Sequence, residues 1–315
     1  MGFENLSIVA TQVGVLFALM AVGFVCRRVK LLDDAAVKGL VNVLVLIVTP
    51  CLVIDCFQRP FTPAQLATLG RAFTLVILAH VLLVAFASVF IRHPAADSRK
   101  VLQMATVFSN AGFMGIPLEQ AIFGADGVFY GIVYVVVFNI LVWSWGYCLM
   151  RGLSVRALGR AQLRTICINP GTVGFAVGLP LFLFSARLPV LVAAPVGFLA
   201  DLNTPLAMLV IGYYLAGAKF GPVLHCRGAY LAAFVRLVAA PLALVAALYP
   251  FRHALDRTMM LTLVTAASAP VAAMTTMFAA QYKRNVDLSV GLVSATTLLS
   301  IFTMPPVIAL AMSVL

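Results

Sequence analysis

Charged residues are scarce in this chain of 315 residues: Asp, Glu, Lys and Arg together make up 10%, and only ten residues are acidic. Soluble globular domains have about 25% charged residues, so the composition excludes that class. Hydrophobic residues account for 63% of the chain, and the mean hydropathy is +1.09. We therefore attribute the net charge of +11 to membrane topology and not to nucleic-acid binding.

Motifs for enzymatic chemistry and for ATP use are missing as well. The sequence contains no G-x-x-x-x-G-K-[ST] loop, no H-E-x-x-H pair and no G-x-S-x-G turn. Its six cysteines lack the spacing of metal ligands, so we expect reduced thiols, no metal site and no cofactor. An intramembrane enzyme and ATP-driven transport by this chain alone are thus unsupported, and no soluble signalling domain indicates a receptor.

Long apolar runs are what the sequence does contain, and they predict an all-α polytopic membrane protein with ten spans. A helix needs about 20 apolar residues to cross the hydrocarbon core. The first run is too long for the apolar region of a cleavable signal peptide. The approximate spans are 6–26, 36–57, 66–91, 101–123, 127–150, 170–186, 189–217, 228–249, 258–281 and 286–312.

Lysine and arginine alternate between the links that join these spans. The odd-numbered links carry fifteen of them and the even-numbered links five, with Arg236 inside the eighth span. The positive-inside rule then places both termini on the outer side of the cell inner (plasma) membrane. The longest link, 151–169, becomes cytoplasmic, and its regularly spaced arginines predict a short amphipathic helix on the membrane surface.

The fourth span contains residues that a membrane helix should avoid, in the segment S-N-A-G-F-M-G-I-P-L from Ser109 to Leu118. Gly112 and Gly115 weaken a helix, and Pro117 removes a backbone donor. Unpaired backbone groups are tolerated in a membrane only where protein or water surrounds them. The segment predicts a broken helix unwound near Pro117, as in transporters, with a proline kink in a packed helix as the alternative.

Prolines recur at matching places in the two halves of the chain. Thr49-Pro50 in the second span matches Thr204-Pro205 in the seventh, and Pro117 in the fourth matches Pro270 in the ninth. Five spans is an odd number, so a second copy enters the membrane from the opposite side. The pattern predicts an inverted repeat, residues 1–150 and 170–315 joined by the linker 151–169, with broken helices four and nine crossing near the midplane.

The motif at Ser109–Leu118, followed by Phe123-Gly124 and the aromatic segment V-W-S-W-G at 142–146, resembles the auxin efflux carrier family. That family includes bacterial organic-acid permeases and plant PIN-type carriers. The resemblance covers the whole chain and implies the crossed-helix fold of bile-acid sodium symporters. It also implies a scaffold of helices 1, 2, 6 and 7 and a moving transport domain of helices 3–5 and 8–10. Ala111 replaces the family's commoner threonine.

Polar residues at membrane depth are the candidate substrate contacts, and Asn110 is the first of them. An uncharged amide donates to a carboxylate without the cost of burying a charge. Free N–H groups at the two breaks complete an anion cradle. The full candidate set is Ser109, Asn110, Gly112, Gly115, Pro117, Asn139, Asn203, Thr204, Ser268 and Pro270.

Three further residues are candidates for energy coupling. Asp201 is an intramembrane carboxyl, and either it carries a proton or it forms a structural pair with Arg236. His80 is a secondary candidate, because histidine changes charge between pH 5 and 8. Asp55, four residues before Arg59, is interpreted as an interface ion pair.

The sequence as a whole predicts a secondary active transporter that moves a small organic anion by alternating access. Proton coupling or the membrane potential is expected to drive it. A sodium-coupled symporter and a channel of the same fold are the alternatives, although the ninth span lacks the acidic residue with which bile-acid symporters bind sodium. Homodimer formation and the direction of transport are left open.

Overall fold

The computed structural model describes residues 2–154, 159 and 170–315 of the chain. Within them the regular structure is helical, and the only extended pairing there is one isolated antiparallel bridge. The surface helix predicted for the linker 151–169 falls mostly on residues that lie outside this set.

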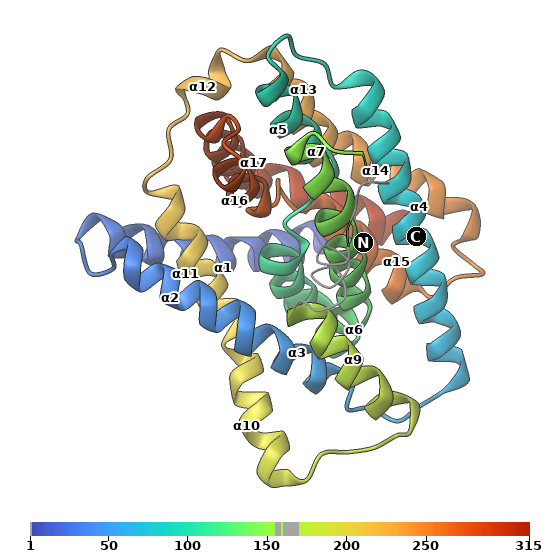
Figure 1. Ribbon diagram of the computed structural model, residues 1–315. Helices are drawn as coiled ribbons and strands as arrows, with labels where there is room; N and C mark the ends of the chain where they lie inside the picture. The colour runs from blue at the N-terminus through green and yellow to red at the C-terminus, as the bar shows by residue number, and fades with distance from the viewer. Residues whose placement is uncertain (1, 155–158, 160–169) are drawn as a thin grey trace.

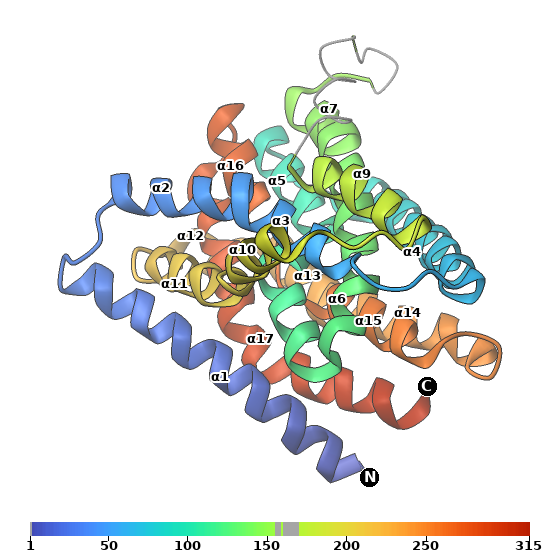
Figure 2. The same cartoon turned by 90° about the horizontal axis from the view of Figure 1, so that it is seen from below.

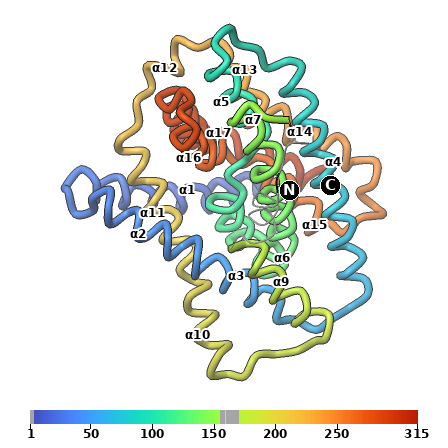
Figure 3. Tube along the Cα trace, viewed as in Figure 1, coloured from blue at the N-terminus to red at the C-terminus, as the bar shows by residue number. Residues whose placement is uncertain are grey.

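Helices follow one another along the chain with short connections (Figures 1 and 3). The first half contains α1 (Gly2–Arg28), α2 (Asp34–Val43), α3 (Thr49–Cys56), α4 (Pro63–Phe90), α5 (Ala96–Val107), α6 (Ile116–Leu141) and α7 (Tyr147–Arg151). The second half contains α9 (Pro170–Leu183), α10 (Val190–Asp201), α11 (Asn203–Leu215), α12 (Gly221–Leu224), α13 (Arg227–Phe234), α14 (Ala240–Leu248), α15 (Arg257–Ser268), α16 (Met274–Gln281) and α17 (Val286–Val314).

Seven helical segments of the described chain are long and apolar enough to cross a membrane. α9 is a shorter apolar helix. α5 is short because residues 108–110 are not helical, and α15 and α16 are short because residues 269–273 interrupt the helix between them. Large apolar side chains point outward, including Leu191 at 89% and Phe184 at 82% exposure. Such a surface fits hydrocarbon and not water, so the chain is a multi-pass membrane protein.

π-helical turns precede three of the prolines within the long helices. The turns Leu44–Val48, Ala111–Gly115 and Val235–Ala239 come two residues before Pro50, Pro117 and Pro241. Proline removes one backbone donor, and the wider turn lets neighbouring groups bond around the loss. At the first turn the Thr49 hydroxyl donates to the Leu44 carbonyl at 2.9 Å. The helices therefore continue past these prolines.

A reversal at Gly124 divides α6 into two segments that run side by side. Gly124 has φ 64° and ψ −149°, a backbone conformation that favours glycine. Gly127 packs so closely against the segment before the turn that an added Cβ would lie 2.6 Å from the Glu119 carbonyl oxygen. The reversal falls between the fourth and fifth predicted spans.

The blue and yellow helices lie together on one side of the molecule in Figure 1, as α1 packs on α11 and α3 packs on α9 and α10. α1 and α11 approach each other backbone to backbone, and Figure 2 shows α1 along one edge. A Cβ on Gly23 would lie 2.1 Å from the Leu209 carbonyl oxygen, and one on Gly212 would lie 1.9 Å from that of Met20. Small residues permit this approach, which is typical of membrane helix pairs.

Replacing Gly23 by alanine should separate α1 from α11. We expect Gly23→Ala to lower the thermal unfolding temperature, since overpacking costs about 1–3 kcal/mol. Gly14→Ala on the same helix is the matched control, because an added Cβ there meets nothing within 4 Å. Unfolding in detergent measures both variants, and equal unfolding temperatures would contradict the proposed close contact.

Candidate functional site at the crossing of two broken helices

Two chain segments leave the helical conformation and cross in the interior of the protein. α5 ends at Val107 and α15 ends at Ser268, and beyond these ends Ser109 pairs with Val271 in an antiparallel bridge. The backbone N–H of Asn110 donates to the Pro270 carbonyl at 2.7 Å, and the backbone N–H of Ala272 donates to the Phe108 carbonyl at 3.0 Å. Each break thus supplies the backbone partners that the other break lacks.

Two further backbone groups of the crossing have hydrogen-bond partners close by. The Val271 amide donates to the Thr296 hydroxyl on α17 at 3.2 Å. The Asn110 carbonyl accepts from the amides of Met114 and Gly115, which begin the next helical segment. Ser109 is fully buried and Asn110 is 6% exposed. The crossing is a packed, hydrogen-bonded unit, as a break within a membrane must be.

Arg236 caps the carbonyl ends of both short helices. It lies in the π turn Val235–Ala239 and is fully buried. Its guanidinium donates to the carbonyls of Thr106 and Val107 at 3.4 and 3.0 Å, and also to the carbonyl of Ala267. The carboxyl end of a helix has a partial negative charge, so a cation is favourable there. Neither ion pair among the described residues includes Arg236.

Polar and aromatic side chains surround this guanidinium. Arg236 interacts with the Tyr134 hydroxyl, which also accepts a hydrogen bond from Ser109 at 3.3 Å. The His80 ring lies 5.0 Å from the Tyr134 ring, and its Nδ1 lies 2.9 Å from the Val76 carbonyl. The Nε2 of His80 is buried without a hydrogen-bond partner. His80, predicted as a coupling residue, therefore lies close to Arg236.

The position of the first break differs from the prediction. The chain is non-helical at 108–110, whereas Pro117 lies in the first turn of α6, after the π turn that contains Gly112 and Gly115. The physical reason is that the π turn before Pro117 lets neighbouring groups bond around its missing N–H, so the helix continues through this proline. At the second break Pro270 lies in the non-helical segment itself, and the Ser268 hydroxyl bonds to the Thr265 carbonyl.

The other predicted contacts lie in two places. The Asn139 side chain donates to the Val135 carbonyl of its own helix at 2.9 Å, the local bond expected of a polar residue in an apolar helix. Asn203 and Thr204 begin α11, which packs against the π turn of the first break. Asn203 is 2% exposed, and its Nδ2 is buried without a partner.

Two ion pairs considered from the sequence, Asp201 with Arg236 and Asp55 with Arg59, are not formed in the structure. Asp201 is exposed at the end of α10 and interacts with Asp55, whereas Arg236 bonds to backbone carbonyls, so the structural pair of Asp201 with Arg236 is not formed. Arg59 pairs with Asp126 at 2.6 Å instead of with Asp55. The spacing of residues within one helix could not predict the observed contacts of Arg59 and Arg236, because their partners come from distant parts of the chain.

Glu119 is the residue that sequence reasoning missed. It lies in the first turn of α6 and is fully buried, although it is not among the candidate residues named from the sequence. Neither of its carboxyl oxygens has a hydrogen-bond partner among the described residues. An acidic residue at the end of a long apolar run, followed by Gly127 and Gly131, was the available signal.

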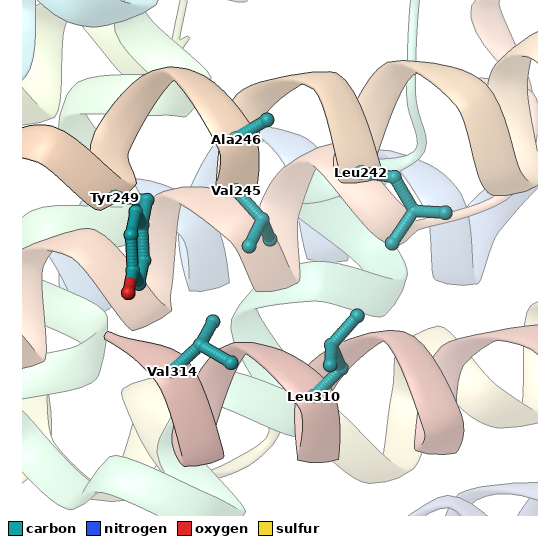
Figure 4. A pocket seen from close by; sticks show the side chains of 6 residues that line it. All are labelled: Leu242, Val245, Ala246, Tyr249, Leu310 and Val314. Carbon is teal, nitrogen blue, oxygen red and sulfur yellow. The ribbon is translucent and has the colours of Figure 1, made fainter.

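Two surface cavities of the described chain lie away from the crossing. A cavity of about 490 Å³ lies between α14 and α17 and is lined mainly by aliphatic side chains (Figure 4). A second, of about 240 Å³, is lined by residues of α13, α17 and the π turn between α13 and α14. No residue of either lining belongs to the crossing, whose side chains are packed closed in this conformation.

Comparison with known proteins places this architecture in context. Residues 8–308 match the model of the family described as "Membrane transport protein". The chain is also 25% identical over 297 residues to an uncharacterized transporter of Methanothermobacter thermautotrophicus, an alignment that covers 91% of this chain and 93% of the relative.

Removing the guanidinium should destabilise the crossing. We expect Arg236→Met to lower the thermal unfolding temperature markedly, because each buried carbonyl left without a donor costs about 1–3 kcal/mol. Arg236→Lys should have a smaller effect, since the charge remains and only the planar fork is lost. Arg227→Met, at an exposed arginine of α13, is the matched control. Unchanged unfolding of Arg236→Met would refute the capping role.

Proposed function

Because this chain belongs to the membrane transport protein family of auxin efflux carriers, we propose that it is a secondary active transporter of a small organic carboxylate anion. The observation that carries the anion preference is the buried Arg236, which forms no ion pair with an acidic residue of the described chain. An uncompensated buried cation raises the local affinity for negative charge.

Helix starts at the crossing support the same preference. The π turn that leads into α6 begins at Ala111, and α16 begins at Met274, each a few residues beyond the bonds that join the breaks. The amino end of a helix has a partial positive charge and free N–H groups, and broken transporter helices bind anions there. We propose that Asn110, Ser109 and Ser268 contact the carboxylate beside these ends.

An inverted repeat of two five-helix units is the proposed architecture. α5 and α15 are both 12 residues long, and both end at the crossing. Matching interruptions occur at Thr49-Pro50, after the π turn in the second span, and at Leu202, between α10 and α11 in the seventh. The grouping of α1–α3 with α9–α11 supports a scaffold against which the remaining helices move. Both termini would lie on the outer side of the inner membrane.

Coupling to protons or to the membrane potential is favoured over sodium. In broken-helix transporters, the carbonyl ends of half-helices are where sodium binds. Here the Val107 and Ala267 carbonyls are occupied by Arg236. A sodium-coupled symporter and a channel remain the alternatives, and transport in liposomes with imposed gradients separates them from a proton-coupled carrier. A channel would show currents far above carrier turnover.

Thermal stabilisation of the purified protein across a panel of carboxylates tests the proposal. A ligand that binds the native state raises its apparent stability, by about 2.7 kcal/mol at one hundred times its Kd. Matched amides or alcohols of the same carbon skeleton serve as controls for the charge. Stabilisation by uncharged analogues but by no carboxylate would refute the assigned substrate class.

Asn110 should be essential for uptake. We expect Asn110→Ala to weaken substrate binding about 5- to 150-fold, because a lost hydrogen bond in a dry site costs about 1–3 kcal/mol. Asn42→Ala, at an exposed asparagine of α2, is the matched control for the loss of an amide. Exchange of labelled substrate in liposomes measures both variants. Near-normal affinity in a folded Asn110→Ala protein would remove Asn110 from the site.

A further inference from the structure

Glu119 occupies a small cradle made by glycines. A Cβ added to Gly131 would lie 1.7 Å from the Glu119 Oε2, and one added to Gly115 would lie 3.5 Å from Oε1. The same position at Gly115 is 3.5 Å from the Cα of Ala266, so Gly115 packs against both the carboxyl and α15, one residue before the carbonyl bound by Arg236. Glycine at 131 thus provides the space that the carboxyl group fills.

This cradle offers the carboxyl space but no partner. Glu119 is 0% exposed, and both of its oxygens lack hydrogen-bond partners in the part of the chain that the structure describes. An ionised carboxylate without a donor costs several kcal/mol in such surroundings, whereas a neutral carboxylic acid costs far less. The conformation described here therefore suits the protonated acid.

Titratable groups on the neighbouring elements do not supply a counter-charge. The charged residues of α1 lie in its first and last turns, and Arg257, at the start of α15, bonds to the Met312 carbonyl. On α4, His80 lies beside Arg236, and on α11, Tyr213 bonds to Asp34. The Cys56 thiol of α3 lies near Glu119, and Arg59, which lies near the same thiol, pairs with Asp126.

Asp201 contrasts with Glu119 in each of these respects. It is exposed at the end of α10, outside the crossing, and lies near another acid, Asp55. His80 is buried, but a proton added to it would place a second positive charge beside Arg236. Of these three groups, Glu119 is the fully buried carboxyl that lacks a hydrogen-bond partner among the described residues.

We propose that Glu119 binds and releases the proton that is coupled to transport, an inference that rests on the proposed carrier function. In the conformation described here, the carboxyl keeps its proton within the glycine cradle. Movement of α6 against α15 opens the cradle to water, and the O–H bond breaks to give a carboxylate and a hydronium ion. The cradle closes again only after the carboxylate has recovered a proton from water.

Liposomes with an imposed pH gradient test this proposal. With the pH gradient as the driving force, the wild-type protein should concentrate a labelled carboxylate on one side of the liposome membrane. Glu119→Gln imitates the protonated acid and should reduce this accumulation at least tenfold. The variant should still exchange substrate, and the rate of exchange should no longer depend on pH. Glu119→Asp should retain gradient-driven accumulation with an altered pH profile. Glu4→Gln, at the exposed and only other glutamate of the chain, is the matched control.

Several outcomes would overturn the inference. Accumulation by Glu119→Gln at the wild-type level excludes Glu119 as the proton carrier. Loss of exchange in both the Gln and the Asp variants assigns it a structural role. Loss of gradient-driven accumulation in Asp201→Asn, with Glu119→Gln unaffected, places the proton on Asp201 instead.

Infrared spectroscopy of the purified protein separates this inference from the carrier proposal, because it requires no substrate. A carbonyl band of a protonated carboxylic acid should be present at neutral pH in the wild type and in Glu4→Gln, and absent in Glu119→Gln. If no carboxylate is transported, the carrier proposal fails while the band still tests Glu119. If transport occurs but the band does not depend on Glu119, only the present inference fails.

Discussion

The exchange of backbone hydrogen bonds between two broken helices is the interaction on which the rest of this structure depends. Hydrocarbon offers no partner for a free amide or carbonyl, so neither break could exist alone. The backbone N–H groups of Asn110 and Ala272 donate across the crossing to Pro270 and Phe108, and Thr296 of α17 accepts from the N–H of Val271. The position of α5 relative to α15 follows from these few bonds.

A positive charge inside the protein is the second consequence of that arrangement. The short helices end with carbonyls that point toward a common place, and Arg236 fills it with a guanidinium whose donors fit several acceptors at once. A buried cation with no acid beside it is costly by itself. The partial negative charges of the helix ends offset part of that cost. The positive potential that remains attracts an anionic ligand.

Much of this organisation could be predicted from the sequence, and the errors have physical causes. Glycine, proline and asparagine in an apolar run indicated a break, and the matching proline indicated a second one, because local chemistry weakens helices there. The exact place of the break, at 108–110 and not at Pro117, depends on the partner segment around Val271. The role of Glu119 was not predicted because its burial results from packing against Gly131, which no local pattern reveals.

The bridge between Ser109 and Val271 also has a consequence for biosynthesis. The two residues are 162 positions apart in the chain, so the partner of the first break does not yet exist when that break leaves the ribosome. At about 5–20 residues per second, the interval is on the order of ten seconds or longer. Throughout that time the amides around Asn110 need water, the translocation machinery or another transient partner, and the fourth span can settle in the bilayer only after α15 has been synthesised.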